Sequence, residues 1–121
     1  MLRVRGMWRC GDVMIDWDRV QDLKTEIGEP DFVEVATMFL DESDEVIARL
    51  SRDHGAKALE LDLHFLKGAA LNLGFSQLAA LCQEGERKAA AGLTDIDVES
   101  VRGAYMVSRQ TFLASFGAQS A

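Results

Sequence analysis

Residues 56–74 read AKALELDLHFLKGAALNLG, and this stretch decides the fold class. Apolar side chains recur in it every three or four residues, a spacing that places them on one face of an α-helix. They are Leu59, Leu63, Leu66, Ala70 and Leu73. Gly74 follows the last of them, and glycine is a common residue immediately after a helix. The stretch therefore predicts an amphipathic helix over residues 56–73.

The rest of the chain repeats this helical period, and no segment shows the alternation typical of a β-strand. Pro30 suits a first helical position, because its missing N–H has no partner there in any case. Short connections between long amphipathic helices favour antiparallel neighbours. We therefore predict an all-α fold, an antiparallel up-down four-helix bundle with a short additional N-terminal helix. The other helices are expected over residues 17–27, 30–52 and 76–91 and in a last segment capped by Thr94, Asp95 or Asp97.

Length and charge narrow the possible functions. The 121 residues are interpreted as one domain, 15–118, between an N-terminal tail, 1–14, that is expected to be flexible and a C-terminal tail, 119–121. The net charge is −7, and three arginines against one aspartate in the first 14 residues leave −9 on the rest. Such an acidic body disfavours binding to nucleic acid or to an anionic membrane. No apolar run approaches the roughly 20 residues that span a bilayer.

Two features are interpreted as structural. Cys10 and Cys82 lie far apart in unlike contexts, so we expect reduced thiols in a cytoplasmic protein, with no disulfide and no metal site. The acidic run DESDE, residues 41–45, is expected to be the solvated face of a helix rather than a metal site.

A second stripe of the helix over residues 56–73 carries the candidate chemistry. His64, Lys67, Gly68 and Leu71 stand at i, i+3, i+4 and i+7, so they share a face turned away from the apolar one. An imidazole is a competent nucleophile near neutral pH, and a nearby ammonium can contact phosphoryl oxygens. Glycine costs about 0.5–1 kcal/mol in a helix interior, and here it clears space beside the histidine. By spacing alone, however, an ordinary surface histidine, as expected for His54, remains the simpler interpretation.

The identities of the residues around His64 are more informative than their spacing alone. The run HFLKGAALNLGF, residues 64–75, closely resembles the signature of histidine phosphotransfer (HPt) domains, H-x-L-K-G-[SA]-[AS]-x-x-[LI]-G. Leu78, Leu81 and the run CQEGE, residues 82–86, continue it like the family's L-x-x-L-C-x-x-L-E. Gly85 departs from this pattern, because the family commonly has leucine there. We expect that glycine to weaken the packing or loosen the helix locally.

The resemblance implies a role and a set of partners. A histidine phosphotransfer domain accepts a phosphoryl group from one response-regulator receiver aspartate and passes it to another. It would do so here on His64, with Lys67 and Gly68 beside it. The expected partners are receiver domains and a cognate or hybrid histidine kinase. The family has no ATP-dependent kinase activity of its own, and the receiver holds the Mg²⁺ for each transfer, so no cofactor is expected in this chain.

Hairpin geometry predicts which residues support His64. If the chain folds back about Gly74, the neighbours of His64 fall near residues 84–86. Glu86 could accept a hydrogen bond from the ring, which would leave Nε2 free to attack, and Gln83 could approach Lys67. The resemblance agrees, because HPt domains often carry Glu or Gln at the position of Glu86. An exposed glutamate paired with Arg87 or Lys88 is the alternative.

Partner docking is expected around the same stripe. Leu71 lies on it, and Phe65 and Phe75 are expected to flank it, although Phe65 is equally consistent with the core. Three other functions stay open: an interaction-only bundle that binds receivers, a histidine-kinase dimerisation segment, and the phosphotransfer module of a chemotaxis-type kinase. The dimerisation segment usually carries an H-E-[LI]-[RK] run, whereas Phe65 follows His64 here.

Overall fold

The structure is a computed structural model that describes residues 14–120, with side chains described as far as residue 115. The described residues form five α-helices and one 3₁₀ turn and contain no strand, which confirms the all-α prediction. None of these helices is long and apolar enough to cross a membrane. The expected flexibility of the N-terminal tail and the state of Cys10 concern residues outside the described part. The elements are α2 Trp17–Ile27, α3 Glu29–Arg49, η2 Arg52–His54, α4 Ala56–Leu73, α5 Ser76–Ala90 and α6 Val98–Ser120.

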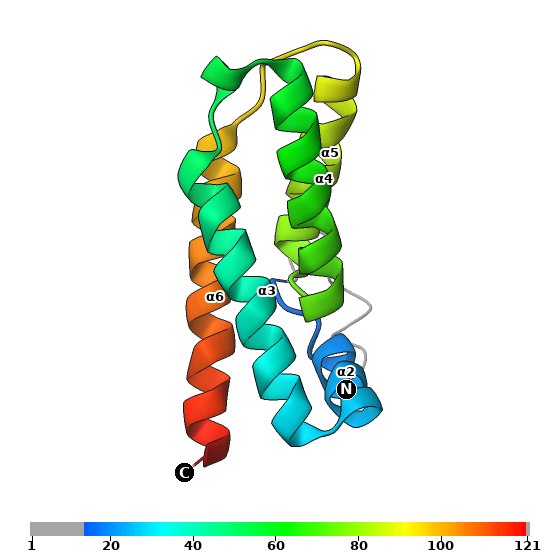
Figure 1. The fold of residues 1–121 in the computed structure, drawn as a ribbon, viewed down its shortest axis with the longest axis vertical. Coiled ribbons are helices and arrows are strands. Elements are labelled where there is room, and N and C mark those ends of the chain that lie inside the picture. Colours follow the sequence, from blue (N-terminus) through cyan, green and yellow to red (C-terminus); the bar gives the residue numbers. More distant parts are fainter. Residues whose placement is uncertain (1–13, 121) are drawn as a thin grey trace, which may run out of the picture.

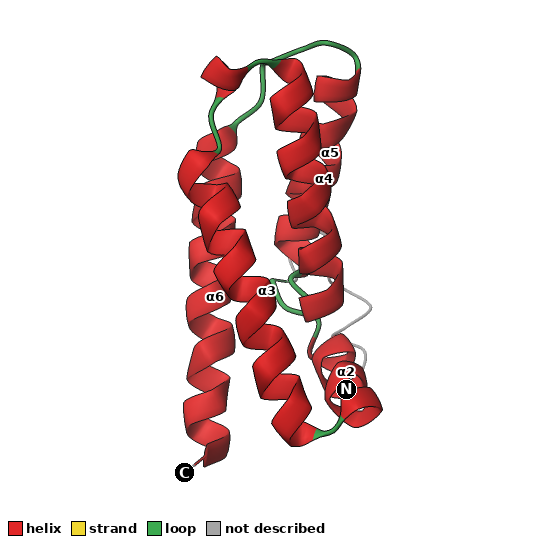
Figure 2. Ribbon diagram, viewed as in Figure 1, coloured by secondary structure: helices red, strands yellow, loops and turns green. Residues whose placement is uncertain are grey.

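The helices α3, α4, α5 and α6 lie lengthwise beside one another, and the short α2 packs against the ends of α3 and α4 (Figure 1). Figure 2 shows the α3–α4 and α5–α6 connections at one end of the molecule and the α2–α3 connection at the other, while the turn between α4 and α5 lies above α2. The connection between α4 and α5 has only two residues, Gly74 and Phe75, and Gly74 adopts the left-handed conformation at φ +81°. The two helices therefore fold back on each other as a hairpin.

Aspartate side chains cap the starts of two helices. The Asp16 carboxylate accepts a hydrogen bond from the Arg19 backbone N–H at the start of α2. Of the three cap candidates for α6, it is the Asp97 carboxylate that accepts from a first-turn N–H, that of Ser100, at 3.0 Å. α6 itself continues to Ser120, two residues beyond the expected domain boundary.

The predicted end of the second helix, near residue 52, is wrong. α3 ends at Arg49, and Leu50 is extended, with ψ at 122°. Arg102 of α6 explains this end, because its Nη2 donates to the carbonyl oxygens of Ile47 at 3.0 Å and Leu50 at 2.7 Å. These two carbonyls near the helix end accept hydrogen bonds from another helix instead of from a continuing turn of α3, so the helix can end before residue 52.

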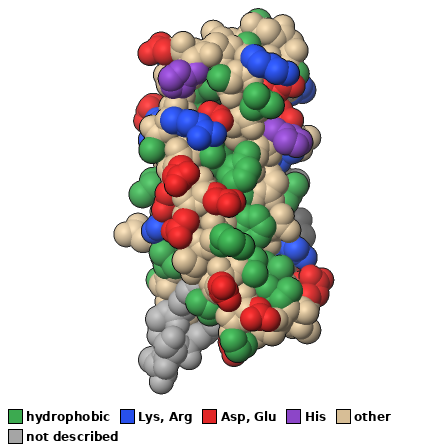
Figure 3. Space-filling view, in the orientation of Figure 1, with side chains coloured by type: hydrophobic (Ala, Val, Ile, Leu, Met, Phe, Trp, Pro, Cys, Tyr) green, Lys and Arg blue, Asp and Glu red, His purple; other side chains and the backbone are tan. Residues whose placement is uncertain are grey.

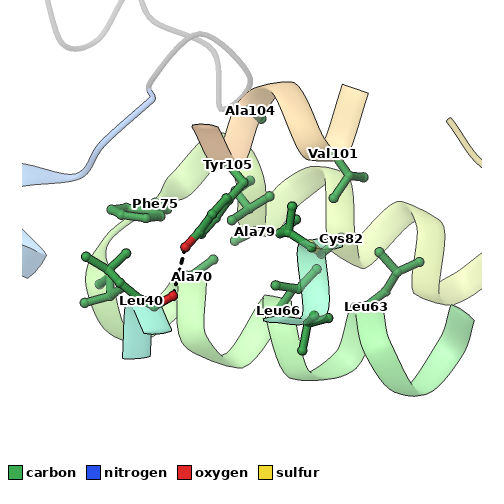
Figure 4. Close-up of a cluster of buried hydrophobic side chains, with 14 of the residues drawn as sticks. Leu40, Leu63, Leu66, Ala70, Phe75, Ala79, Cys82, Val101, Ala104 and Tyr105 are labelled. Carbon is green, nitrogen blue, oxygen red and sulfur yellow. Dashed lines mark hydrogen bonds between the residues drawn. The ribbon is translucent and has the colours of Figure 1, made fainter. Parts of the chain in front are cut away.

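The core lies between α3, α4, α5 and α6, with contributions from α2. Tyr105 of α6 inserts among Leu40, Ala70 and Phe75, and its hydroxyl points to the Leu40 carbonyl (Figure 4). Phe112 lies edge-on to Phe75, with ring centroids 5.5 Å apart. Such aromatic pairs add to the free energy gained by burying apolar area.

The acidic run 41–45 is not simply a solvated face. Ser43 is buried, and Asp44 binds α6 across the bundle. Arg109 donates to both Asp44 oxygens, from Nε at 3.0 Å and Nη2 at 2.9 Å, and the Tyr105 hydroxyl also donates to this carboxylate. The prediction of a solvated face therefore holds for Asp41, Glu42 and Glu45 and is wrong for the other two.

Gly85 does not loosen α5, so that prediction is also wrong. The glycine is buried, and a Cβ placed on it would lie 2.8 Å from Leu63 Cδ1 and 3.2 Å from Ile96 Cγ2. Ile96 comes from the segment between α5 and α6 and is itself buried. Its side chain occupies the space that a larger residue at position 85 would need.

Candidate functional site

His64 projects from the middle of α4 into solvent. Its side chain is 68% exposed, unlike the buried leucines on either side of it at positions 63 and 66. Nδ1 lies 2.8 Å from Glu86 Oε2. A carboxylate oxygen can only accept, so Nδ1 carries the proton in this pair. Among the described residues no group bonds Nε2, so this nitrogen can present its lone pair.

Glu86 reaches this position because of the α4–α5 hairpin. His64 stands ten residues before Gly74 and Glu86 twelve after it, so the two lie opposite each other. The turn is held by the Phe75 N–H, which donates to the Ala70 carbonyl at 2.8 Å, and by the Asp16 N–H, which donates to the Gly74 carbonyl at 2.6 Å. Glu86 is only 19% exposed and faces α4 rather than solvent.

The same carboxylate also binds Lys67. Oε1 of Glu86 lies 2.9 Å from Lys67 Nζ. This oxygen is shielded from solvent and accepts no hydrogen bond of regular geometry, so the ammonium balances its charge as an ion pair. The Lys67 ammonium holds the pKa of Glu86 below its ordinary value, the His64 ring contributes less, and partial burial opposes both. Glu86 is therefore ionised at neutral pH and joins the two residues.

Gly68 leaves open space next to the histidine. A Cβ placed on it would meet nothing within 4 Å, in contrast to Gly85. Its carbonyl accepts a hydrogen bond from Asn72 Nδ2 at 3.0 Å, within α4. A partner can therefore approach the backbone of α4 at the turn that follows His64.

Two residues that the sequence predicts to be at the site do not contact it in the structure. Phe75 was expected at the docking surface, but it is 1% exposed and packs against Phe112 in the core, so it cannot contact a partner. Gln83 was expected to approach Lys67, but it is exposed and makes no hydrogen bond within the described part of the chain. Glu86 takes the position next to the ammonium because it lies one helical turn closer to the end of α5.

Apolar side chains surround the exposed histidine. Leu71 is 57% exposed on the His64 stripe, and Phe65 is partly buried against the core. Leu61, one turn before His64, is 59% exposed and was missed by sequence reasoning. The sequence does contain a feature that identifies Leu61: it is an apolar residue three positions before His64 that lies outside the apolar face of the helix. Figure 3 shows hydrophobic side chains gathered along the face where α3 and α4 meet.

Comparison with known proteins agrees with this geometry. The model of the family described as Hpt domain matches residues 34–115, which run from α3 into α6 and contain the whole His64 site. The chain belongs to the Hpt domain family. Hpt domains carry out histidine phosphotransfer in phosphorelays and interact with receiver domains and histidine kinases. No curated protein and no solved structure matches the chain.

Membership in the Hpt family disfavours the kinase dimerisation segment as an interpretation of the chain. α2 and the first residues of α3 precede the matched residues. Within the described residues, no group of three or more His, Cys, Asp or Glu side chains is arranged to hold a metal ion.

Proposed function

We propose that this Hpt domain accepts a phosphoryl group on His64 from a response-regulator receiver aspartate and passes it to another receiver. The observation that carries the proposal is the Glu86 carboxylate, which contacts Nδ1 of an exposed histidine with one oxygen and the Lys67 ammonium with the other. A histidine held in this way has its proton on Nδ1 and its nucleophilic lone pair on Nε2.

Each residue has a part in the transfer. The Nε2 lone pair of His64 attacks phosphorus, the bond from phosphorus to the aspartate oxygen breaks, and that carboxylate leaves with the electron pair. The ring gains positive charge while it keeps the Nδ1 proton, and Glu86 stabilises that charge. Lys67 neutralises the equatorial oxygens of the loose transition state, on which the negative charge is spread. The same groups serve the reverse step, transfer from His64 to the next aspartate.

The chain is proposed to need no cofactor and no ATP. The receiver partner would hold the Mg²⁺, and this chain would supply only the nucleophile, the ammonium and the carboxylate. We further propose that residues 15–118 form the domain and that α3 to α6 form an antiparallel up-down four-helix bundle. The expected partners imply a cytoplasmic location.

A receiver is proposed to dock over the apolar side chains around His64. Leu71 and Leu61 are each more than half exposed, and Phe65 lies between them on the same side of α4. Gly68 would admit the partner's backbone or its phosphoaspartate loop. Exposed apolar side chains clustered near a reactive group are natural contacts for a partner.

Phosphotransfer profiling with a histidine control tests the proposal. Radiolabelled phosphoryl groups on each receiver domain of the source genome should move to wild type and to His54→Ala, but not to His64→Gln. His54 is the matched control, because it is exposed and lies in η2, outside the α4–α5 hairpin that brings Glu86 to His64. Label retained by His64→Gln would refute the assignment. Binding without any transfer would favour an interaction-only bundle, and labelling only by a kinase domain with ATP would favour a chemotaxis-type module.

A further inference from the structure

α4 and α5 approach each other closely one residue away from the site. Leu63 directly precedes His64, Gly85 directly precedes Glu86, and the two face each other across the hairpin. The position of a Cβ on Gly85 is only 2.8 Å from Leu63 Cδ1, closer than real Cβ atoms come to another heavy atom. At this spacing of the helices, a side chain at position 85 would force Leu63, Ile96 or one of the helices to shift.

The neighbours of Gly85 have little room to move. Leu63 is 0% exposed and Ile96 is 4% exposed. The segment that carries Ile96 is tied to α5 twice through Lys88, whose carbonyl accepts from the Leu93 N–H at 3.0 Å and whose Nζ donates to the Asp95 carbonyl at 3.2 Å. A methyl group at position 85 would lie between two packed side chains, so α5 would have to move away from α4.

We infer that Gly85 is a positioning residue, which sets the spacing of α4 and α5 so that Glu86 reaches both His64 and Lys67. This inference rests on the proposed function. Glu86 accepts a hydrogen bond from Nδ1 at 2.8 Å and forms an ion pair with Nζ at 2.9 Å. A shift of α5 by about 1 Å would carry the Nδ1 contact out of hydrogen-bond range and lengthen the ion pair.

The departure from the family pattern fits this role. A leucine at position 85 would fill the space between the helices with its own side chain. Here the space is filled from two sides, by Leu63 of α4 and by Ile96 of the α5–α6 connection. The small residue at position 85 and the large one at position 96 are thus complementary in size. Their contact lies next to Glu86, whose carboxylate binds the His64 ring.

Gly85→Ala, alone and combined with Leu63→Val, tests the inference. Valine at position 63 removes the Cδ1 atom that a new Cβ would meet. In the single variant, ¹⁵N NMR should show that His64 loses its preference for the Nδ1-protonated tautomer, and phosphoryl acceptance should slow roughly tenfold or more. The double variant should recover both the tautomer and the rate. Gly103→Ala in α6 is the matched control, because its Cβ would meet nothing within 4 Å.

The outcomes separate this inference from the proposed function. A folded Gly85→Ala chain with the wild-type tautomer and rate would overturn the positioning role. So would a slower rate with an unchanged tautomer that Leu63→Val does not restore. If Gly85→Ala does not fold, the double variant is compared with Leu63→Val alone, and equal tautomer and rate support the inference. If the wild-type chain is never phosphorylated, the proposed function fails, while the tautomer still reports whether Gly85 positions Glu86.

Discussion

Glu86 uses its two carboxylate oxygens for different partners. Oε2 faces the His64 ring and Oε1 faces Lys67, so one side chain contacts both the imidazole and the ammonium. In the proposed transfer, an arriving phosphoryl group would carry negative charge and would compete with Oε1 for the same ammonium.

The lowered pKa of Glu86 gives a direct prediction. The Lys67 ammonium is its largest cause, so Lys67→Met should raise the pKa of Glu86, and by more than His64→Gln does. A lowered carboxyl pKa means that the stability due to the pair is present above the ordinary pKa of a glutamate. That stability is lost as the pH falls through the lowered value. A ¹³C NMR titration of the Glu86 carboxyl carbon checks this, and an unchanged titration in Lys67→Met would contradict it.

Lys67 is also expected to act in the transfer itself. Lys67→Ala should slow phosphotransfer about tenfold in both directions, because the transition state loses a positive charge beside its equatorial oxygens. Lys57→Ala is the matched control, since its side chain is 80% exposed on the same helix and pairs only loosely with Glu60, at 4.0 Å. Single-turnover rates with a labelled receiver measure both variants. Equal rates for the two would argue against a role for Lys67.

At the scale of the helices, polar groups join α3 and α6 in addition to apolar contacts such as that of Phe32 with Phe112. Asp44, Leu40 and Ile47 of α3 offer oxygen atoms, and Tyr105, Arg109 and Arg102 of α6 donate to them. Burial, with a smaller contribution from Asp44, raises the pKa of Tyr105, so its hydroxyl stays protonated and remains a donor. These bonds set the rotation of α6 against α3.

Removal of that hydroxyl should weaken the bundle. Tyr105→Phe should lower the free energy of unfolding by about 1–3 kcal/mol, because the Leu40 carbonyl and Asp44 lose a buried donor. Urea unfolding followed by circular dichroism measures the change. The next residue, Met106, is 51% exposed, and Met106→Ala should change the stability by less than about 0.5 kcal/mol. Similar stabilities for Tyr105→Phe and wild type would show that the hydroxyl contributes nothing.

At the scale of the whole molecule, exposed apolar side chains lie close to His64. Leu61 and Leu71 are exposed on both sides of the histidine, and a band of apolar side chains follows the junction of α3 and α4 (Figure 3). The body of the chain is otherwise acidic, with a net charge of −7 for the whole sequence. A partner that docks here is therefore selected by apolar contact as well as by charge.

The docking surface yields a kinetic prediction. Leu71→Asp should raise KM for a phosphorylated receiver about tenfold, equivalent to about 1.4 kcal/mol, with a smaller effect on kcat. The aspartate would replace an apolar contact but would leave His64, Lys67 and Glu86 untouched. Met106→Asp on α6 is the control with a similar exposed fraction, 51% against 57%. Equal KM values for the two variants would place the docking surface elsewhere.

Much of the architecture could be predicted from the sequence, because it depends on local geometry. The spacing of apolar residues identified five helices, and the bounds of α2 and α4 agree with prediction at both ends. The exposed stripe of His64 follows from the 3.6-residue period alone. The contact of Glu86 with the ring follows from one turn at Gly74, because a short hairpin leaves little freedom in how two helices pair.

The features that only the tertiary structure decided all involve groups distant in sequence. Phe75 is buried by Phe112, α3 ends early because Arg102 binds its last carbonyls, and Gly85 is tightly packed because Ile96 lies against it. Lys67 binds Glu86 rather than Gln83 for the same reason. The period of a helix determines which of its faces is apolar, since it depends only on backbone geometry. Which side chains meet across two helices depends on their rotation and spacing, and these result from every contact in the core at once.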